Sequence, residues 1–163
     1  MSNFSPAYAR TLLYKGQLPE NSVVTATLSI QGYVPVATIP AGTRFLETLE
    51  CADSPTLTLI GDGVRVEESL VLDGSLSLKT IGRFLTVGHN CSFSGCSGLR
   101  SIGEGLSVGG SLSLDGCPVD IELPEHGFVG RNLTLPSGFD LRRYPVGLKV
   151  AGSIHLEHLP DSH

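Results

Sequence analysis

Residues 104–116 read EGLSVGGSLSLDG, a stretch in which apolar residues alternate with glycine and serine. Leu106 and Val108 are two positions apart, and the same spacing separates Leu112 from Leu114. A period of two is typical of β-strands that bury one face, so we expect the four apolar side chains to point inward and the serines between them to point outward. We expect bends with a positive φ at three of the four glycines of the stretch, namely Gly109, Gly110 and Gly116.

The pattern recurs every 21 residues along the chain. Steps of 21 from Val108 always reach an apolar residue, in the series Val24, Phe45, Val66, Val87, Val108, Val129 and Val150. The positions four and six residues later are apolar in all seven repeats, and a further apolar column stands beside a glycine or proline. Because one such unit cannot bury its own apolar face, stacked units are required. The sequence therefore predicts an all-β protein, a single β-solenoid (β-helix) of about seven 21-residue coils over residues 18–163, with a short N-terminal cap over residues 1–17.

The composition agrees with this fold and restricts the function classes. The 163 residues include 20 glycines and 10 prolines, which disfavour long helices. A net charge of −5 disfavours general binding to nucleic acid. The chain has no apolar run of about 18 residues, so we expect no membrane span. The four cysteines form no CxxC pair and the first residues lack a secretory pattern, which predicts a reduced, cytoplasmic protein.

The repeat also contains a polar column and one irregular region. The position three residues after each anchor is always Ser, Thr or Asn, which predicts a corner ladder that satisfies backbone groups (Thr27, Thr48, Ser69, Asn90, Ser111, Asn132 and Ser153). Asp120 falls in an otherwise apolar column, so we expect a one-residue shift or bulge between Cys117 and Ile121. We also expect Phe128 to occupy an outward position.

The coils LSVGGSLSLDG and LPEHGFVGRNLTL resemble the Leu-Pro-x-Gly-Leu-x-Val-x-Gly-x-Leu-x-Leu repeats of bacterial and phage proteins that are described as leucine-rich-repeat-like. The resemblance covers about residues 18–160. It implies a β-solenoid, and it implies that the protein acts by binding other proteins, as an effector or as an uncharacterised phage protein does. The chain lacks the asparagine turn of true leucine-rich repeats, so we expect a straight coil rather than a horseshoe.

The cysteines and histidines are the candidates for metal chemistry. Cys96 and Cys117 are 21 residues apart, so we expect a stacked pair of half-buried thiols, with a disulfide or a metal pair as the alternative. Cys51 and Cys91 occupy core columns and are interpreted as small apolar residues. The alternative to a solvated terminal edge is a metal site built from His155, His158 and His163. We expect no cofactor and no catalytic set, because no nucleophile and base recur together.

Charged and small polar residues supply the candidate binding surface. Glu47, Glu50, Glu67 and Glu68 predict an acidic patch on coils two and three. Ser92, Ser113 and Thr134 form an outward strip beside Asp73, Ser94 and Asp115. Basic rows are expected on another side, formed by Lys79, Arg100 and Arg142 and by Arg44 and Arg65. Oppositely charged faces suit recognition of a protein partner.

These observations favour a non-enzymatic protein-binding β-solenoid that binds through a flat outer face, as a bacterial effector or as a phage inhibitor of a host defence complex. The expected site residues are Glu47, Glu50, Glu67, Glu68, Asp73, Asp115, Ser92 and Ser113. A weak alternative within this class is mimicry of nucleic acid by the acidic patch. The alternatives from other classes are a small glycan-binding or glycan-acting coil, for which the outward aromatic candidates are Tyr33, Phe128 and Phe139, and a structural coil that self-assembles. An end-to-end homodimer is a further expectation, since solenoid ends expose strand edges.

Overall fold

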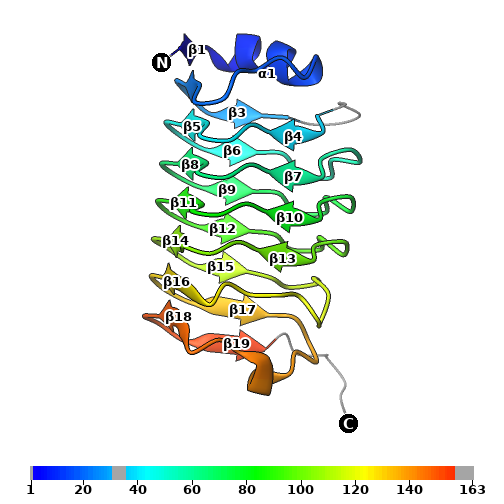
Figure 1. The fold of residues 1–163 in the computed structure, drawn as a ribbon, viewed down its shortest axis with the longest axis vertical. Helices are drawn as coiled ribbons and strands as arrows, with labels where there is room; N and C mark the ends of the chain where they lie inside the picture. Colours follow the sequence, from blue (N-terminus) through cyan, green and yellow to red (C-terminus); the bar gives the residue numbers. More distant parts are fainter. Residues whose placement is uncertain (1, 31–35, 157–163) are drawn as a thin grey trace.

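The computed structural model, which describes residues 2–30 and 36–156, is a parallel β-solenoid of about seven turns. Each coil advances the chain by 21 residues, so Val87 pairs with Val66 on one side and with Val108 on the other. The coils stack on one another along a straight axis, with the first and the last described strands at opposite ends of the stack (Figure 1). The predicted solenoid is confirmed.

Three parallel sheets form the sides of the coil within the described residues. The first sheet has the order β1 (Asn3–Phe4), β2 (Val23–Val24), β5 (Arg44–Phe45), β8 (Arg65–Val66), β11 (Thr86–Val87), β14 (Leu106–Val108), β16 (His126–Val129) and β18 (Gly147–Val150). The second sheet has the order β3 (Leu28–Ser29), β6 (Leu49–Glu50), β9 (Leu70–Val71), β12 (Cys91–Ser92), β15 (Leu112–Ser113), β17 (Leu133–Leu135) and β19 (Ile154–Leu156). The third sheet is shorter and contains β4 (Thr38–Ile39), β7 (Leu59–Ile60), β10 (Thr80–Ile81) and β13 (Ser101–Ile102).

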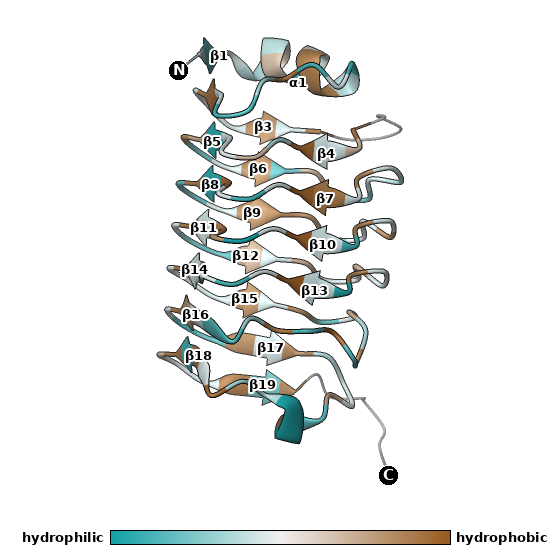
Figure 2. Cartoon of the chain, in the orientation of Figure 1, coloured by the Kyte–Doolittle hydropathy of each residue, from teal (hydrophilic) through white to brown (hydrophobic). Residues whose placement is uncertain are grey.

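The core consists of the apolar columns that the repeat predicts. Leu106, Val108, Leu112 and Leu114 are all buried, and the serines between them are half-buried on the outside. The anchor column is buried from Val24 to Val129, and Val150 in the last coil is partly buried. Apolar residues recur at the same place in successive coils (Figure 2). Burial of each such side chain stabilises the fold by about 1.5–3 kcal/mol relative to exposure.

The N-terminal residues cover the first coil with a strand and a helix together. β1 adds to the first sheet beside β2, and α1 (Pro6–Tyr14) lies across the end of the stack (Figure 1). The helix begins after Ser5, whose side-chain oxygen accepts a hydrogen bond from the Tyr8 amide at 3.3 Å. Ala9 and Leu13 on its inner side are buried in the core. The cap therefore shields the apolar columns that would otherwise end at the first coil.

The bends of the solenoid use glycine for two different reasons. Gly116 has a φ of 76°, as predicted, and so belongs to the left-handed region that favours glycine. The prediction of a positive φ is wrong for Gly109 and Gly110. A Cβ atom on Gly109 would overlap the carbonyl oxygen of Gly88 in the preceding coil, and one on Gly110 would overlap the Asn90 side chain. Close approach of neighbouring coils, rather than φ, requires glycine at these two positions.

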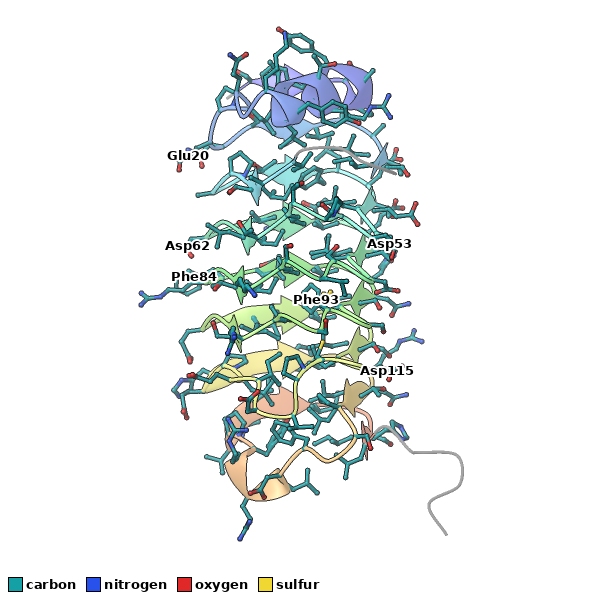
Figure 3. All side chains as sticks on the ribbon, turned by 90° about the vertical axis from the view of Figure 1, so that its right-hand side faces the viewer. Glu20, Asp53, Asp62, Phe84, Phe93 and Asp115 are labelled. Carbon is teal, nitrogen blue, oxygen red and sulfur yellow. The ribbon has the colours of Figure 1, made fainter. Side chains whose placement is uncertain are left out.

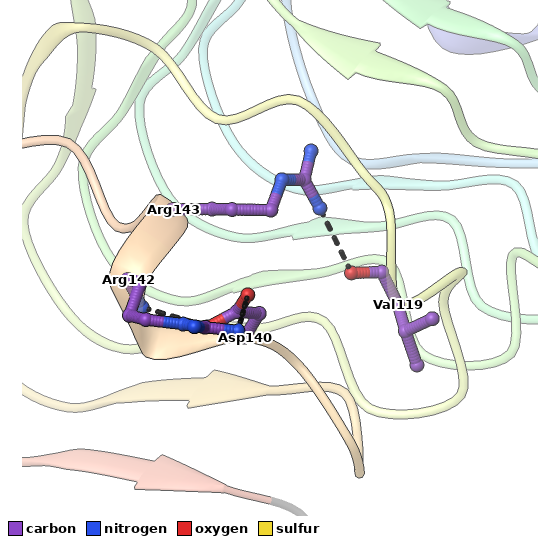
Figure 4. Close-up of polar contacts among 4 residues, drawn as sticks. All are labelled: Val119, Asp140, Arg142 and Arg143. Atoms are coloured by element: carbon purple, nitrogen blue, oxygen red, sulfur yellow. Dashed lines mark hydrogen bonds and ion pairs between the residues drawn. The ribbon is translucent and has the colours of Figure 1, made fainter.

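The irregular coil lies where the sequence predicts it. Ile121 is buried while Val119 and Asp120 are exposed, and the third sheet ends here in an isolated bridge between Ser101 and Glu122. A 3-10 turn follows at Leu141–Arg143, one coil further on. Arg143 donates hydrogen bonds to the carbonyl oxygens of Val119 (3.3 Å, Figure 4) and Asp120 (3.1 Å), so the turn replaces the missing strand as a brace.

Candidate functional site

The predicted site residues lie on the outer side of the second sheet and along its two edges. We define the outer strip as the outward-facing residues of this sheet, namely Ser29, Glu50, Val71, Ser92, Ser113, Thr134 and His155. Parallel pairing in register sets them in one row along the stack. Glu47, Glu67 and Glu68 precede the sheet at one edge, whereas Asp73 and Asp115 follow it at the other.

Four residues of the strip and its edge form a hydrogen-bonded network. The Ser92 hydroxyl donates to Asp73 Oδ1 at 2.5 Å, and the Ser94 amide donates to the same oxygen at 3.1 Å. The Ser94 hydroxyl is 3.2 Å from that of Ser92 and 2.9 Å from that of Ser113. The network spans three coils and fixes the orientation of its hydroxyl groups. The structure therefore brings together four of the residues that the sequence analysis placed side by side.

At the N-terminal end of the site, the carboxylates carry structural hydrogen bonds. Glu47 Oε2 accepts from both the amide and the hydroxyl of Thr27, at 3.1 and 2.9 Å. Glu50 Oε1 accepts from the Ser29 hydroxyl at 3.1 Å. These carboxylates are half-buried and link neighbouring coils.

The expectation that acidic and basic residues lie on separate faces is wrong at Glu67. Its Oε2 atom is 2.7 Å from Arg44 Nε and 2.9 Å from Arg65 Nε. Burial opposes ionisation of this carboxylate, but the hydrogen bonds and charges of the two arginines outweigh it and lower the pKa of Glu67. Arg44 and Arg65 face outward from adjacent strands of the first sheet, so they meet Glu67 at the corner. The patch of four glutamates is thus partly neutralised.

The basic row predicted from Lys79, Arg100 and Arg142 is interrupted as well. Lys79 and Arg100 are exposed in successive coils, but the third member of the series, Arg142, lies on the 3-10 turn and pairs with Asp140 (Figure 4). Hydrogen bonds from the side chain and the amide of Arg142 lower the pKa of Asp140.

The predicted corner ladder is present between the first and second sheets from Asn90 to Ser153, whereas Thr27 at the other end of the row donates its hydroxyl to Glu47. Asn90 Oδ1 accepts from the Ser111 amide at 2.9 Å, the Ser111 hydroxyl accepts from the Asn132 amide at 3.2 Å, and Asn132 Oδ1 accepts from the Ser153 amide at 3.0 Å. Each side chain satisfies the backbone donor of the next coil, which supports a structural role for this row.

The four cysteines are buried free thiols. Cys96 and Cys117, predicted to be half-buried, are in fact buried, and each donates through Sγ to a backbone carbonyl of the preceding coil at 3.1 Å. Burial raises the pKa of Cys51 and Cys96 to about 11 and that of Cys117 to about 12. The pKa of Cys91 is also raised by burial. Such thiols are protonated and unreactive at neutral pH.

Within residues 2–30 and 36–156, no group of three or more His, Cys, Asp or Glu side chains is placed to hold a metal ion. His155 lies on β19, and the other two histidines of the suggested terminal site, His158 and His163, lie outside the described residues. Across those same described ranges, the structure contains no helix of the length and apolarity needed to cross a bilayer.

The aromatic candidates for glycan binding have different environments. Phe128 is exposed, as expected, but Phe139 is buried with 5% of its surface exposed, so the prediction that it points outward is wrong. Phe139 lies beneath Arg143, whose guanidinium carbon is 5.9 Å from the ring centre. Tyr33 lies outside the described residues.

Sequence reasoning missed one unusual exposed residue, Phe84. It has a φ of 59° and 61% of its surface is exposed. The equivalent positions in neighbouring coils, which also have positive φ, are Asn21, Gly42, Gly63 and Gly105. The sequence did contain a signal for this residue, because a phenylalanine stands in a column that otherwise holds glycine or asparagine.

A pocket near the cap was also not predicted. It has a volume of about 530 Å³ and lies where the segment after α1 meets the outer side of the third sheet. Leu18, Pro40 and Leu59 line it together with the carboxylate residues Glu20 and Asp62.

The described residues thus define a β-solenoid repeat protein with one ordered polar face. No protein-family model matches the chain, and comparisons with curated proteins and with solved structures find no match.

Proposed function

We propose that the chain is a non-enzymatic protein-binding β-solenoid that recognises its partner through the outer strip. The supporting observation is the network of Asp73, Ser92, Ser94 and Ser113, whose polar groups are held in place before any partner arrives. A preorganised surface loses less conformational entropy on binding than a mobile one, so more of the interaction energy contributes to affinity. Glu50 and Glu68 extend this surface with negative charge, which favours a partner rich in basic groups and hydrogen-bond donors.

The resemblance of the repeats to those of bacterial and phage proteins supports a bacterial setting. In this proposal the chain is an effector or a phage inhibitor that occupies a surface of a host protein complex, including a defence complex. The cytoplasm of the producing or infected cell is the proposed location. Mimicry of nucleic acid is less well supported, because Glu67 is neutralised by two arginines.

The test uses a matched pair of substitutions in one coil. Ser113 faces outward in the second sheet and Ser107 faces outward in the first, and both are half-buried. The wild-type chain and the S113R and S107R variants are used to capture proteins from bacterial lysates, and each captured protein is then purified and titrated. We expect a stoichiometric partner whose affinity falls at least about 30-fold with S113R, as for loss of a central contact, and stays unchanged with S107R. Equal affinity of the two variants for the partner would show that the outer strip is not the interface.

The charge of the surface is tested separately with E68K. Glu47, Glu50 and Glu67 are left unchanged, because their contacts with Thr27, with Ser29 and with the two arginines join neighbouring coils. We expect slower association and a weaker dependence on salt concentration for E68K. A glycan array screened with the wild-type chain examines the alternative function, and specific glycan binding that survives S113R would favour it.

A further inference from the structure

Phe84 has a strained backbone conformation and an exposed side chain, and the fold described above requires neither of them. A bulky residue at positive φ is a rare outlier, which persists only where something compensates for it. The neighbouring coils show that the corner closes with glycine or asparagine at this position. The ring extends over Gly105, where a Cβ atom would lie 2.5 Å from Phe84 Cδ1. An exposed, sterically supported aromatic side chain is a typical anchor of a protein interface.

The pocket beside the cap lies on the same edge of the molecule. Glu20 and Asp62, which line the pocket, and Phe84 follow one another down one edge of the stack (Figure 3). Asp62 precedes Phe84 by one coil, and its Oδ1 accepts a hydrogen bond from the Arg83 amide at 2.8 Å. The protruding ring and the apolar pocket are therefore separate but adjacent features of one surface.

The charges around the two features are opposite. The pocket contains two carboxylate residues, Glu20 and Asp62, whereas the protruding ring is preceded by the exposed Arg83. In the part of the chain that the structure describes, the Arg83 guanidinium is in no ion pair. A surface that carries a protrusion, a pocket and opposite charges beside them is complementary to a second copy of itself.

We propose that two copies of the chain associate along this edge about a two-fold axis, with Phe84 of each copy inserted in the pocket of the other. In this arrangement Arg83 approaches Glu20 and Asp62 of the second copy. A two-fold contact fills both pockets at once and leaves neither protrusion free, so assembly stops at the dimer. The volume of about 530 Å³ falls in the range of pockets that enclose small ligands, which is ample for one phenyl ring. The outer strip lies on a different sheet and stays accessible in the dimer.

The first experiment measures self-association by sedimentation velocity over a wide range of protein concentration. We expect a concentration-dependent dimer of the wild-type chain and an increase of at least about 30-fold in the dimer dissociation constant for F84G. F128S is the matched control, because Phe128 is also an exposed phenylalanine and faces outward from the first sheet, where the preceding coil has Ser107. A wild-type chain that stays monomeric at every concentration, or an equal effect of F128S, would overturn the proposal.

The second experiment tests the charges. R83E is expected to weaken the dimer, and E20R combined with R83E is expected to restore it, since the pair is then reversed across the interface. Asp62 is left unchanged because its side chain holds the Arg83 amide. Failure of the combined variant to recover any affinity would contradict the arrangement of Arg83 beside the pocket.

The third experiment reports the geometry directly. Purified F84C and L59C variants are mixed under mild oxidation, and the disulfide that joins one chain of each kind is detected by mass spectrometry. The four native cysteines are buried and do not compete. A dimer that forms with no disulfide between the F84C chain and the L59C chain would show that another surface mediates it, and binding of a small apolar compound by a monomeric chain would assign the pocket to a ligand instead.

Discussion

At the scale of single residues, the 21-residue spacing leaves little freedom where successive coils touch. Gly109 lies so close to the Gly88 carbonyl that no Cβ atom fits. The side chains at such corners are therefore determined by the neighbouring coil, which is remote in the sequence.

Substitution of Gly109 tests this close approach. We expect G109A to lower the free energy of unfolding by about 1–3 kcal/mol, because the added methyl group forces two coils apart. S107A in the same coil is the control and should change it by less than about 0.5 kcal/mol. Urea unfolding measures both, and equal stabilities would show that the corner relaxes without cost.

Replacement of Phe84 by glycine is expected to leave the fold stable. Removal of the side chain relieves about 1–2 kcal/mol of left-handed strain, while the greater freedom of glycine in the unfolded chain costs about 0.5–1 kcal/mol. We therefore expect F84G to unfold within about 1 kcal/mol of the wild type. A loss of several kcal/mol would indicate that the ring stabilises the monomer and would undermine an interface role.

The buried thiols predict a loss of stability at alkaline pH. The folded-state pKa values of Cys51, Cys96 and Cys117 are raised above the ordinary value of 9.0. Below about pH 9 both states keep their protons, so stability is unaffected. Above it the unfolded chain alone loses them, and the free energy of unfolding falls by about 1.4 kcal/mol per pH unit for each thiol until the folded pKa is reached.

Urea unfolding at several pH values between neutral and pH about 10.5 measures this slope. The double variant C96S/C117S keeps a hydrogen-bonding side chain, as Ser54 and Ser75 do at the equivalent positions of earlier coils. The free energy of unfolding of this variant should fall less steeply with pH than that of the wild type, because two of the ionising thiols are removed. An identical slope would assign the alkaline transition to other groups.

At the scale of elements, α1 closes the first coil through a few apolar contacts. Leu13 is buried in the core and Thr11 is exposed on the same helix. We expect L13A to lower the free energy of unfolding by about 2–5 kcal/mol, whereas T11A should change it by less than about 0.5 kcal/mol. Thermal and urea unfolding compare the two, and a negligible effect of L13A would mean that the solenoid does not need this cap.

The sequence predicted the elements unevenly, and the reason is physical. The spacing within the repeat identified the strands of the first and second sheets, because the anchor column and the column four residues later are apolar in every coil. The loss of the third sheet after β13 was foreseen only as a shift near Asp120. The 3-10 turn that replaces it depends on Arg143 reaching the carbonyl groups of the preceding coil, which is a tertiary contact.

At the scale of the whole molecule, each coil is stabilised mainly by its two neighbours. The end coil has a neighbour on one side among the described residues, and the residues of β19 are exposed. We expect its amides to exchange with deuterium faster than those of β12, which pairs on both sides. Mass spectrometry of peptides from both strands measures this, and equal protection would indicate that the far end is covered.

The sequence by itself determined the architecture, since a column that is apolar in every 21-residue unit can be buried only by stacking. It also placed Asp73, Ser92, Ser94 and Ser113 together, because equivalent positions in a solenoid are neighbours. The tertiary structure alone decided that Glu67 pairs with two arginines, that Phe139 is buried and that Phe84 protrudes beside an apolar pocket. Those outcomes depend on side-chain reach across corners and on backbone φ, which a pattern of apolar and polar residues does not specify.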